Sequence, residues 1–290
     1  MPQTDHSSKL SRPELPSDKA VIDHLRASAA DIVLPYFQSL TDAEIKTKTS
    51  PNDFVTIADE QCEAYLSAAL VTLLPGSTVV GEEAVAADPS ILERLNVGGD
   101  VWIIDPIDGT YNYAHDDPRF ATIVALVRDG VVVAGYIHVP VTGQTYAARL
   151  GGGVWRNGER LRVAEPAPLG EMTAVLYVGK SRAPALYERI KALKGELGPR
   201  RFDRSAAFEH IAMLTGKAHY SIFTRLLPWD HAAGILMCTE AGGCYGYFDE
   251  GPSVDAWSPV NRDMPFLLAP DPATWWIIRQ KLGEAVTEPG

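Results

Sequence analysis

The sequence predicts a mixed α+β and α/β fold in which sheets are layered with helices. Three observations lead to this expectation: the chain opens with segments of helical periodicity, its middle reads as successive hairpins, and helical and strand-like segments alternate from Met172 onward. With 290 residues, of which 46% are hydrophobic, the chain is long enough for one large core or two coupled domains.

Two helices are expected in the first part of the chain. Ser17 can cap the first, in which apolar residues recur at helical spacing as far as Val33. Thr56 can cap the second, which reads IADEQCEAYLSAALVTLL. The polar stretch KTKTSPNDFVT between them reads as a loop or a short hairpin, and residues 1–16 as a mobile tail.

Strands are expected next. TVVG and VWIID come first, and the apolar β-rich runs from Phe120 to Val163 follow, with strong turn signals at Asp129-Gly130 and Asn157-Gly158. We therefore expect residues 120–163 to form an antiparallel sheet.

The last part alternates between strands and helices. The expected strands are TAVLYV, RRFD, AHYSIF and PFLLA, and the expected helices are APALYERIKAL, SAAFEHIAMLTG, one that begins at Asp230, and PATWWIIRQKLGEA. A proline-rich join, AEPAPLGEM, predicts an N-terminal domain over 17–168 and a C-terminal domain over 169–290 that contributes Asp230 and substrate contacts.

Charge and cysteine content exclude several classes of protein. The 26 Lys and Arg stand against 37 Asp and Glu, and this net charge of −11 argues against binding to nucleic acid or to an anionic membrane. Cys62, Cys238 and Cys244 lack CxxC spacing, so we expect buried thiols rather than disulfides or a zinc site. The N-terminus has no secretory signal, and no run approaches the roughly 18 apolar residues of a membrane span, so we expect a cytoplasmic protein.

Two carboxylates stand out in the stretch WIIDPIDGTYNY. Asp105 ends a buried-looking strand, Pro106 turns the chain, and Asp108 returns to the same side. Gly109 and Thr110 then begin a short helix whose free amides could hold a phosphate. Magnesium prefers such oxygen ligands. Further acids lie at the ends of expected elements: Asp59, Glu82, Glu83 and Asp230.

Each of these acids also has an ordinary structural interpretation. Asp230 could cap its helix, Asp59 could be a favourable acid in a first helical turn, and Glu82-Glu83 could lie in a solvated loop. Because they gather at element ends rather than on helix faces, together they indicate a metal site.

The same stretch resembles the signature of the inositol monophosphatase family, W-x-I-D-P-I-D-G-T-x-N-F. PWDHAAGILMCTEAGG resembles its second signature, and Gly81-Glu82-Glu83 and KTSPNDFVTIAD resemble two further blocks in family order. The resemblance covers nearly the whole chain beyond the N-terminal tail. It implies an alternating α-β-α-β-α layered sandwich, a magnesium-dependent, lithium-sensitive phosphate monoester hydrolase, and commonly a homodimer.

The resemblance also implies which residues hold the metal. Glu82, Asp105 and the backbone carbonyl of Ile107 would hold a first magnesium, and Asp105, Asp108 and Asp230 a second. Glu82 would also touch a third, weaker ion, which gives two to three ions per active site.

The implied catalytic residues are Asp59, Thr110 and Glu82; the first two would orient a metal-bound water and help to deprotonate it. Lys48 and Glu83 would support a mobile loop. The implied substrate-binding residues, which meet a small phosphorylated metabolite, are Asp108, Gly109, Thr110, Arg204, Ser205, Ala206 and Asp230.

Two departures from inositol-specific members leave the substrate open. Arg204 stands where these often carry a glycine, and Phe223 where they often carry a carboxylate, seven residues before Asp230. Arg204 could contact an acidic group on the substrate or make a structural ion pair, and Thr224 or a water could replace the missing acceptor. We expect a broad-specificity phosphatase that accepts inositol 1-phosphate. The alternatives are histidinol phosphate, a sugar (bis)phosphate or a 3'-phosphonucleotide as substrate, or a non-catalytic regulatory binding protein.

Overall fold

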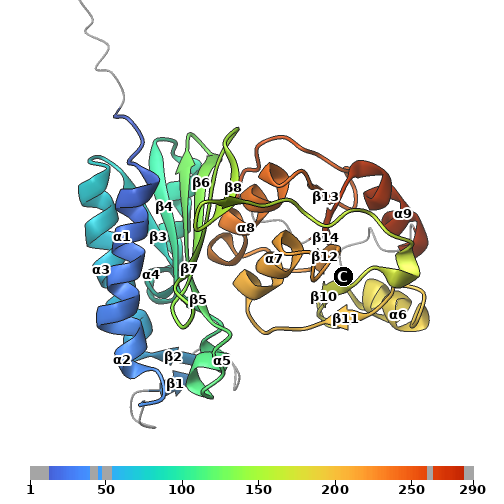
Figure 1. Ribbon diagram of the computed structural model, residues 1–290, viewed down its shortest axis with the longest axis horizontal. Coiled ribbons are helices and arrows are strands. Elements are labelled where there is room, and N and C mark those ends of the chain that lie inside the picture. Colours follow the sequence, from blue (N-terminus) through green and yellow to red (C-terminus); the bar gives the residue numbers. More distant parts are fainter. Residues whose placement is uncertain (1–12, 40–44, 48–53, 260–263, 284–290) are drawn as a thin grey trace, which may run out of the picture.

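The computed structural model describes residues 13–39, 45–47, 54–259 and 264–283. Its elements form five layers, α-β-α-β-α, as expected (Figure 1). A seven-stranded sheet and a five-stranded sheet make up the two β-layers, and a pair of helices lies between them. No helix within the described ranges is long and apolar enough to span a bilayer.

The first helical layer follows the predicted caps. α1 (Asp18–Ser28) begins at the N-cap Ser17 and continues as a π-helical turn over Ala29–Val33 and as α2 (Leu34–Tyr36). α3 (Ile57–Leu73) begins at Thr56, whose side chain and backbone make a reciprocal capping box with Asp59. Between these helices, β1 (Ile45–Thr47) and β2 (Phe54–Thr56) pair antiparallel, so part of the polar stretch is a hairpin.

The seven-stranded sheet has its strands in chain order. They are β3 (Thr78–Gly81), β4 (Asp100–Asp108), β5 (Ala121–Arg128), β6 (Val131–Val139), β7 (Gln144–Arg149), β8 (Gly153–Arg156) and β9 (Glu159–Arg160). Within this sheet, β3 and β4 pair in parallel and all other neighbouring strands pair antiparallel. The predicted antiparallel sheet over 120–163 is therefore confirmed. Helices cover both faces of this sheet, which explains why its central strands are almost continuously apolar (Figure 1).

One expectation and one alternative interpretation in this region were wrong. The chain does not turn away at Pro106: β4 continues to Asp108, and its register against β5 shifts between Asp105 and Asp108. Proline has no N–H to give to the ladder, and the irregularity leaves its carbonyl free to accept the Thr122 hydroxyl at 2.9 Å. Glu82 and Glu83 do not lie in a loop but open a helix, α4 (Glu82–Ala87), which a 3₁₀ helix over Pro89–Asn96 follows.

The five-stranded sheet has the order β11-β10-β12-β14-β13. Its strands are β10 (Ala174–Tyr177), β11 (Arg200–Arg201), β12 (Tyr220–Phe223), β13 (Cys244–Tyr247) and β14 (Phe266–Ala269). β13 was not predicted. Its pairing with β14 defines this strand, and Gly246 is needed in it because a Cβ atom there would lie 2.1 Å from the Gly251 carbonyl oxygen.

The helices of this half are α6 (Pro184–Ala192), α7 (Ala206–Leu214), α8 (Pro228–Glu240) and α9 (Pro272–Leu282). α7 and α8 form the central layer, and α6 and α9 cover the outer face (Figure 1). α8 begins two residues before the predicted start, with Leu227 as its N-cap. Asp230 therefore lies inside the first turn, and the possibility that it caps the helix is wrong.

The central layer joins the two sheets through a continuous apolar core. One buried cluster runs from Val80 on β3 to Leu268 on β14 by way of α7 and α8. A Cβ atom on Gly135 of β6 would lie 2.9 Å from the Ala233 Cα atom of α8, so α8 rests directly on the larger sheet. This close contact fixes the position of Asp230 at the helix start. The three cysteines are free and buried, as expected, and the domain division at 168 stays a prediction.

Candidate active site

A cavity of about 440 Å³ opens where β4 meets the first turns of α5 (Thr110–Ala114) and α8. A smaller one, of about 130 Å³, adjoins it and shares Asp108, Arg204 and Asp230 in its wall. The structure brings most of the predicted site residues to the larger cavity: Glu82, Asp105, Ile107, Asp108, Gly109, Thr110, Arg204 and Asp230. Ser205 and Ala206 line the smaller one.

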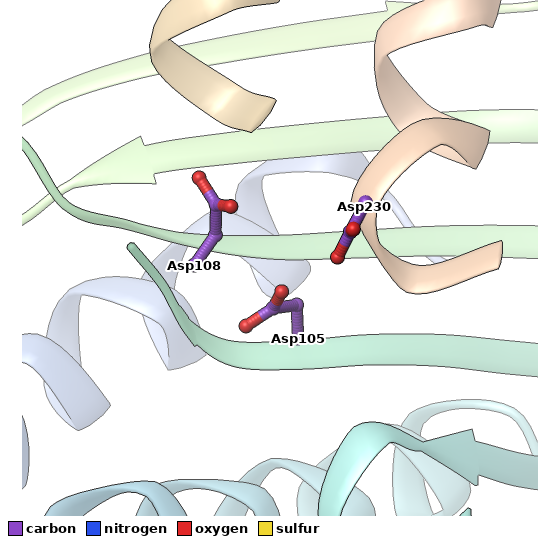
Figure 2. A group of neighbouring side chains, drawn as sticks. All are labelled: Asp105, Asp108 and Asp230. Atoms are coloured by element: carbon purple, nitrogen blue, oxygen red, sulfur yellow. The ribbon is translucent and has the colours of Figure 1, made fainter. Parts of the chain in front are cut away.

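Three carboxylates converge in the larger cavity. Figure 2 shows Asp105 and Asp108 on β4 facing Asp230 on α8, and one oxygen of each lies within 4.8 Å of the others. Asp105 Oδ1 is fully enclosed and has no hydrogen-bond partner among the described residues. Burial, and then the neighbouring acids, raise the pKa of Asp105 and of Asp230 well above the usual range. A set of converging oxygens with an enclosed, unpartnered atom fits a hard divalent cation such as magnesium.

Asp108 is held from the other side by the N-terminus of α7. The Ser205 hydroxyl and the Ala207 N–H, at 2.8 Å, donate to its Oδ2 atom, and the Ala206 N–H donates to Oδ1 at 2.9 Å. Burial raises the pKa of Asp108 to about 6, and these hydrogen bonds act in the opposite direction. α7 thus fixes the orientation of a carboxylate that belongs to β4.

Asp59 and Thr110 meet beside the three carboxylates. Asp59 is fully buried and accepts hydrogen bonds from the Thr56 N–H at 2.8 Å and the Thr56 hydroxyl at 2.6 Å. The Thr110 hydroxyl lies 2.9 Å from the Ile107 carbonyl oxygen and 3.5 Å from Asp59 Oδ1. Burial is the main reason that the pKa of Asp59 rises to about 8, and the charges of Glu83 and Glu82 add to it. The acid that completes the helix cap is therefore also in contact with the site.

These features can be compared with known proteins. The sequence model of the inositol monophosphatase family matches residues 17–271. The chain belongs to this family. It is accordingly a phosphoric monoester hydrolase.

Several relatives in the inositol monophosphatase family are about one-third identical to the chain. An inositol-1-monophosphatase of Bacillus subtilis is 32% identical over 224 residues, which cover 76% of this chain and 81% of the relative. A fructose-1,6-bisphosphatase/inositol-1-monophosphatase of Thermotoga maritima is 32% identical over 221 residues, or 74% and 78% of the two chains. The solved structure of a Thermotoga maritima IMPase has a TM-score of 0.75 at 26% identity and covers 91% of this chain and 96% of its own.

Gly109 allows the family signature to turn tightly at the site. It caps α5 with a φ of 87°, in the left-handed region. A Cβ atom here would lie 3.0 Å from the Arg119 carbonyl oxygen and 3.1 Å from the Ser205 Cβ atom. Glycine is therefore required both by the backbone angle and by the space.

Gly109→Ala should lower kcat/KM by about tenfold or more and destabilise the fold by roughly 1–3 kcal/mol, because the added methyl group pushes Ser205 away from Asp108. The matched control is Gly130→Ala, which also has a positive φ, of 79°, but has no atom within 4 Å of the new Cβ. Urea unfolding and initial rates check both variants. Equal activity losses in the two variants would contradict the claim that space around Gly109 matters.

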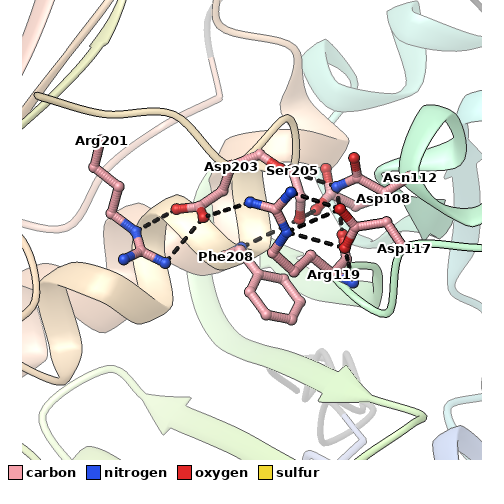
Figure 3. A network of polar contacts seen from close by, with 8 residues as sticks. All are labelled: Asp108, Asn112, Asp117, Arg119, Arg201, Asp203, Ser205 and Phe208. Atoms are coloured by element: carbon pink, nitrogen blue, oxygen red, sulfur yellow. Dashed lines mark hydrogen bonds and ion pairs between the residues drawn. The ribbon is translucent and has the colours of Figure 1, made fainter.

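A polar network fastens this signature of the inositol monophosphatase family to the loop before α7 (Figure 3). Asn112 donates to the Asp203 carbonyl at 2.9 Å and to the Arg119 carbonyl at 2.7 Å. Asp203, which is buried, pairs with Arg201 and with Arg119, and Arg119 pairs with Asp117. The sequence did not single out these residues; only Asn112 lies within a recognised signature.

Arg204 lies at the end of this network and faces the cleft. Its backbone adopts a φ of 56°, which is uncommon for a residue other than glycine. Its guanidinium lies 4.4 Å from the ring centroid of Tyr111 and 5.9 Å from that of Phe202, and the residue lines both cavities. The ion pairs among the described residues do not include Arg204, so the structure favours the first of its two interpretations, a group available to substrate.

Aromatic residues form a wall of the larger cavity that the sequence did not reveal. Tyr177 and Phe202 stack with their centroids 6.1 Å apart and remain 49% and 54% exposed at the rim, with Tyr111 and Trp229 nearby. Tyr177 ends a strand that reads as core in the sequence. Its exposure follows from the arrangement of β10 in the sheet, for which no local signal exists.

The two predicted supporting residues are less informative. Lys48 lies outside the described residues. Glu83 is half-buried and lines neither cavity; its backbone N–H donates to Glu63 at 2.8 Å, which fixes the start of α4 and so places Glu82.

Proposed function

We propose that the protein is a magnesium-dependent phosphatase that hydrolyses a range of small phosphate monoesters, inositol 1-phosphate among them. The observation that carries this proposal is the convergence of Asp105, Asp108 and Asp230, with an unpartnered Asp105 oxygen, beside the contact between Thr110 and Asp59.

The oxygen donors would divide between two cations. Glu82, Asp105 and the Ile107 carbonyl would hold the first, and Asp105, Asp108 and Asp230 the second, with Glu82 also touching a weaker third. Bound magnesium ions would neutralise the phosphate and make water a better nucleophile at neutral pH.

Side chains of the protein would accept the proton that the attacking water loses. The Thr110 hydroxyl lies 3.5 Å from Asp59 Oδ1, and Thr110 lines the open cavity, where it could contact a water that attacks phosphorus. Without metal, Asp59 is mostly protonated at neutral pH, because its pKa is about 8. Cations bound nearby would favour its carboxylate form, which could then accept a proton. Gly109 and Thr110 would place their backbone amides against the phosphate, and the α7 N-terminus would keep Asp108 aligned throughout.

The alcohol side of the site favours broad specificity. Phe223 is 1% exposed and offers no acceptor to a polyol. Thr224 does not supply the missing acceptor. Its hydroxyl accepts a hydrogen bond from the Gly179 N–H at 3.1 Å and donates one to the Tyr177 carbonyl, and Thr224 lines neither cavity. Arg204 would favour substrates with a second anionic group, such as a sugar bisphosphate or a 3'-phosphonucleotide.

The remaining parts of the proposal concern the cell. We propose that the protein is a cytoplasmic homodimer, that lithium inhibits it, and that it binds neither nucleic acid nor membrane. The acidic charge and the family agree with these properties.

Phosphate release from a panel of esters tests the function. We expect magnesium-dependent turnover of inositol 1-phosphate, glycerol 2-phosphate, histidinol phosphate, fructose 1,6-bisphosphate and 3'-phosphoadenosine 5'-phosphate, with kcat/KM values within about a hundredfold of each other. A hundredfold corresponds to roughly 2.7 kcal/mol of differential transition-state binding.

Reactions with chelator in place of magnesium are the control for this panel. A preference well above a hundredfold for one ester would contradict broad specificity. No release from any ester would favour the non-catalytic binding protein instead.

A further inference from the structure

The smaller cavity lies where the alcohol of a bound phosphate ester would extend. It shares Asp108 and Asp230 with the larger cavity, so a group attached to a phosphate at these carboxylates can enter it. Its wall includes Phe223, whose ring packs on the His231 ring with centroids 4.4 Å apart. Neither Phe223 nor Thr224 offers this cavity a hydrogen-bond acceptor, as described above.

Glu209 of α7 also lines this cavity. It is only 3% exposed, and the described residues provide no hydrogen bond or ion pair to its carboxylate. Its oxygens are not among the fully enclosed polar atoms that lack a hydrogen bond, so they remain open to the cavity. A buried carboxylate without a partner is costly, and a ligand that donates to it would remove the cost.

The position of Glu209 on α7 places it beside the reacting end of the substrate. Ser205 and Ala206, which hold Asp108, precede it by one helical turn, so all three lie on the same side of the helix. The charges that act on Glu209 are the like charges of Asp108, Asp203 and Asp230 and the opposite charge of Arg201. Arg204 and Arg225 lie in the cavity wall, and neither pairs with it among the described residues.

We propose that Glu209 is a specificity residue that accepts a hydrogen bond from a hydroxyl or ammonium group on the leaving alcohol, in place of the carboxylate that is absent at Phe223. The proposal rests on the phosphatase function proposed above.

Matched pairs of substrates test this proposal. Inositol 1-phosphate and cyclohexyl phosphate differ in ring hydroxyls, and phosphoethanolamine and propyl phosphate differ in an ammonium group. We expect the wild type to prefer the donor-bearing member of at least one pair by about tenfold or more in kcat/KM, and Glu209→Leu to reduce that preference to about twofold. The pair that responds identifies the donor as hydroxyl or ammonium.

Glu209→Gln keeps one carbonyl acceptor and should retain part of a preference for hydroxyls. Glu209→Ala is the second variant if leucine does not fit the cavity, with the same expected result. The matched control is Glu188→Leu on α6, where the side chain is 55% exposed, and this change should leave both preferences unaltered.

The outcomes separate this inference from the function. Wild-type turnover without any preference for donors, or a preference that survives Glu209→Leu and Glu209→Ala, would overturn the role of Glu209 alone. Equal losses on both members of a pair would show a structural role and overturn it too. If the wild type releases phosphate from no substrate, the proposed function fails and this inference fails with it.

Discussion

Asp105→Asn is expected to lower kcat/KM by about a thousandfold and, at the same time, to raise the melting temperature of the metal-free protein. The activity loss corresponds to roughly 4 kcal/mol of transition-state stabilisation, because an amide cannot replace the charged oxygen that we propose is shared between cations. The stability gain follows from the surroundings of Asp105. It is buried against Glu82, Asp108, Asp230 and Asp59, so the folded metal-free protein must either keep a charge that these acids repel or take up a proton, and an amide avoids both costs.

Phosphate release and thermal unfolding, each with magnesium and with chelator, check both halves of this prediction. Asp23→Asn is the control, because Asp23 is exposed and, within the described part of the chain, its one ion pair is with Lys19 on α1; such surface pairs contribute at most about 1 kcal/mol. Near-normal turnover of Asp105→Asn at saturating magnesium would refute the metal assignment. An activity loss with a lower melting temperature in chelator would point to misfolding instead.

Asp108→Asn would be a less clean test of the same idea. Both oxygens of Asp108 accept N–H or O–H groups from the start of α7, so one side of an amide would meet those donors. Such a mismatch should destabilise the fold by roughly 1–3 kcal/mol, and the Asp105→Asn substitution avoids it.

The second large effect concerns pH and magnesium together. Without metal, the free energy of unfolding should fall as the pH rises from about 6.5 to about 8.5, and millimolar magnesium should largely remove this fall. The pKa of Asp59 is raised to about 8 and those of Asp105 and Asp230 are raised well above the usual range, whereas carboxylates in an unfolded chain titrate near 4.

The sign follows from proton counts. In this window the folded protein holds protons that the unfolded chain has already released, so a rise in pH favours unfolding. The buried histidines act with the opposite sign, mainly at lower pH: burial lowers the pKa of His138 and of His210 to about 4, unfolded histidines titrate near 6.5, and this effect on stability fades within about one pH unit above that value.

Melting temperatures at three pH values, with magnesium or with chelator at matched ionic strength, measure this dependence. Since the cation competes with protons for the same oxygens, the magnesium-induced shift should grow with pH. A shift that is independent of pH, or no shift at all, would contradict a carboxylate site for the metal.

The parts of this structure that could be predicted depend on neighbours in sequence. Asp129-Gly130 marks a hairpin, and Thr56 with Asp59 marks a helix start, because the interacting atoms lie within a few residues. The acids of β4 were found for the same reason, since Asp105, Asp108 and Thr110 stand together in one signature.

The parts that were missed depend on contacts between distant segments. Ser205 and Asp108 are 97 residues apart, and Asn112 and Asp203 are 91 residues apart. In the sequence, Glu209 and its neighbour His210 are the polar residues of an otherwise apolar helix, and a solvent-facing position would show the same pattern. Its orientation into a cavity is decided by how α7 packs between the sheets, which periodicity alone does not determine.

The layered arrangement has a consequence for how such a protein could diverge during evolution. Asp105 and Asp108, which we propose as metal ligands, belong to one strand of the larger sheet, whereas Arg204, Glu209 and Phe223 belong to the other half of the chain. In the cluster of Asp105, Asp108 and Asp230, α8 supplies the one acid that comes from this other half. Mutations in α7 and β12 could therefore redirect the enzyme to a new alcohol while the reaction chemistry is inherited unchanged.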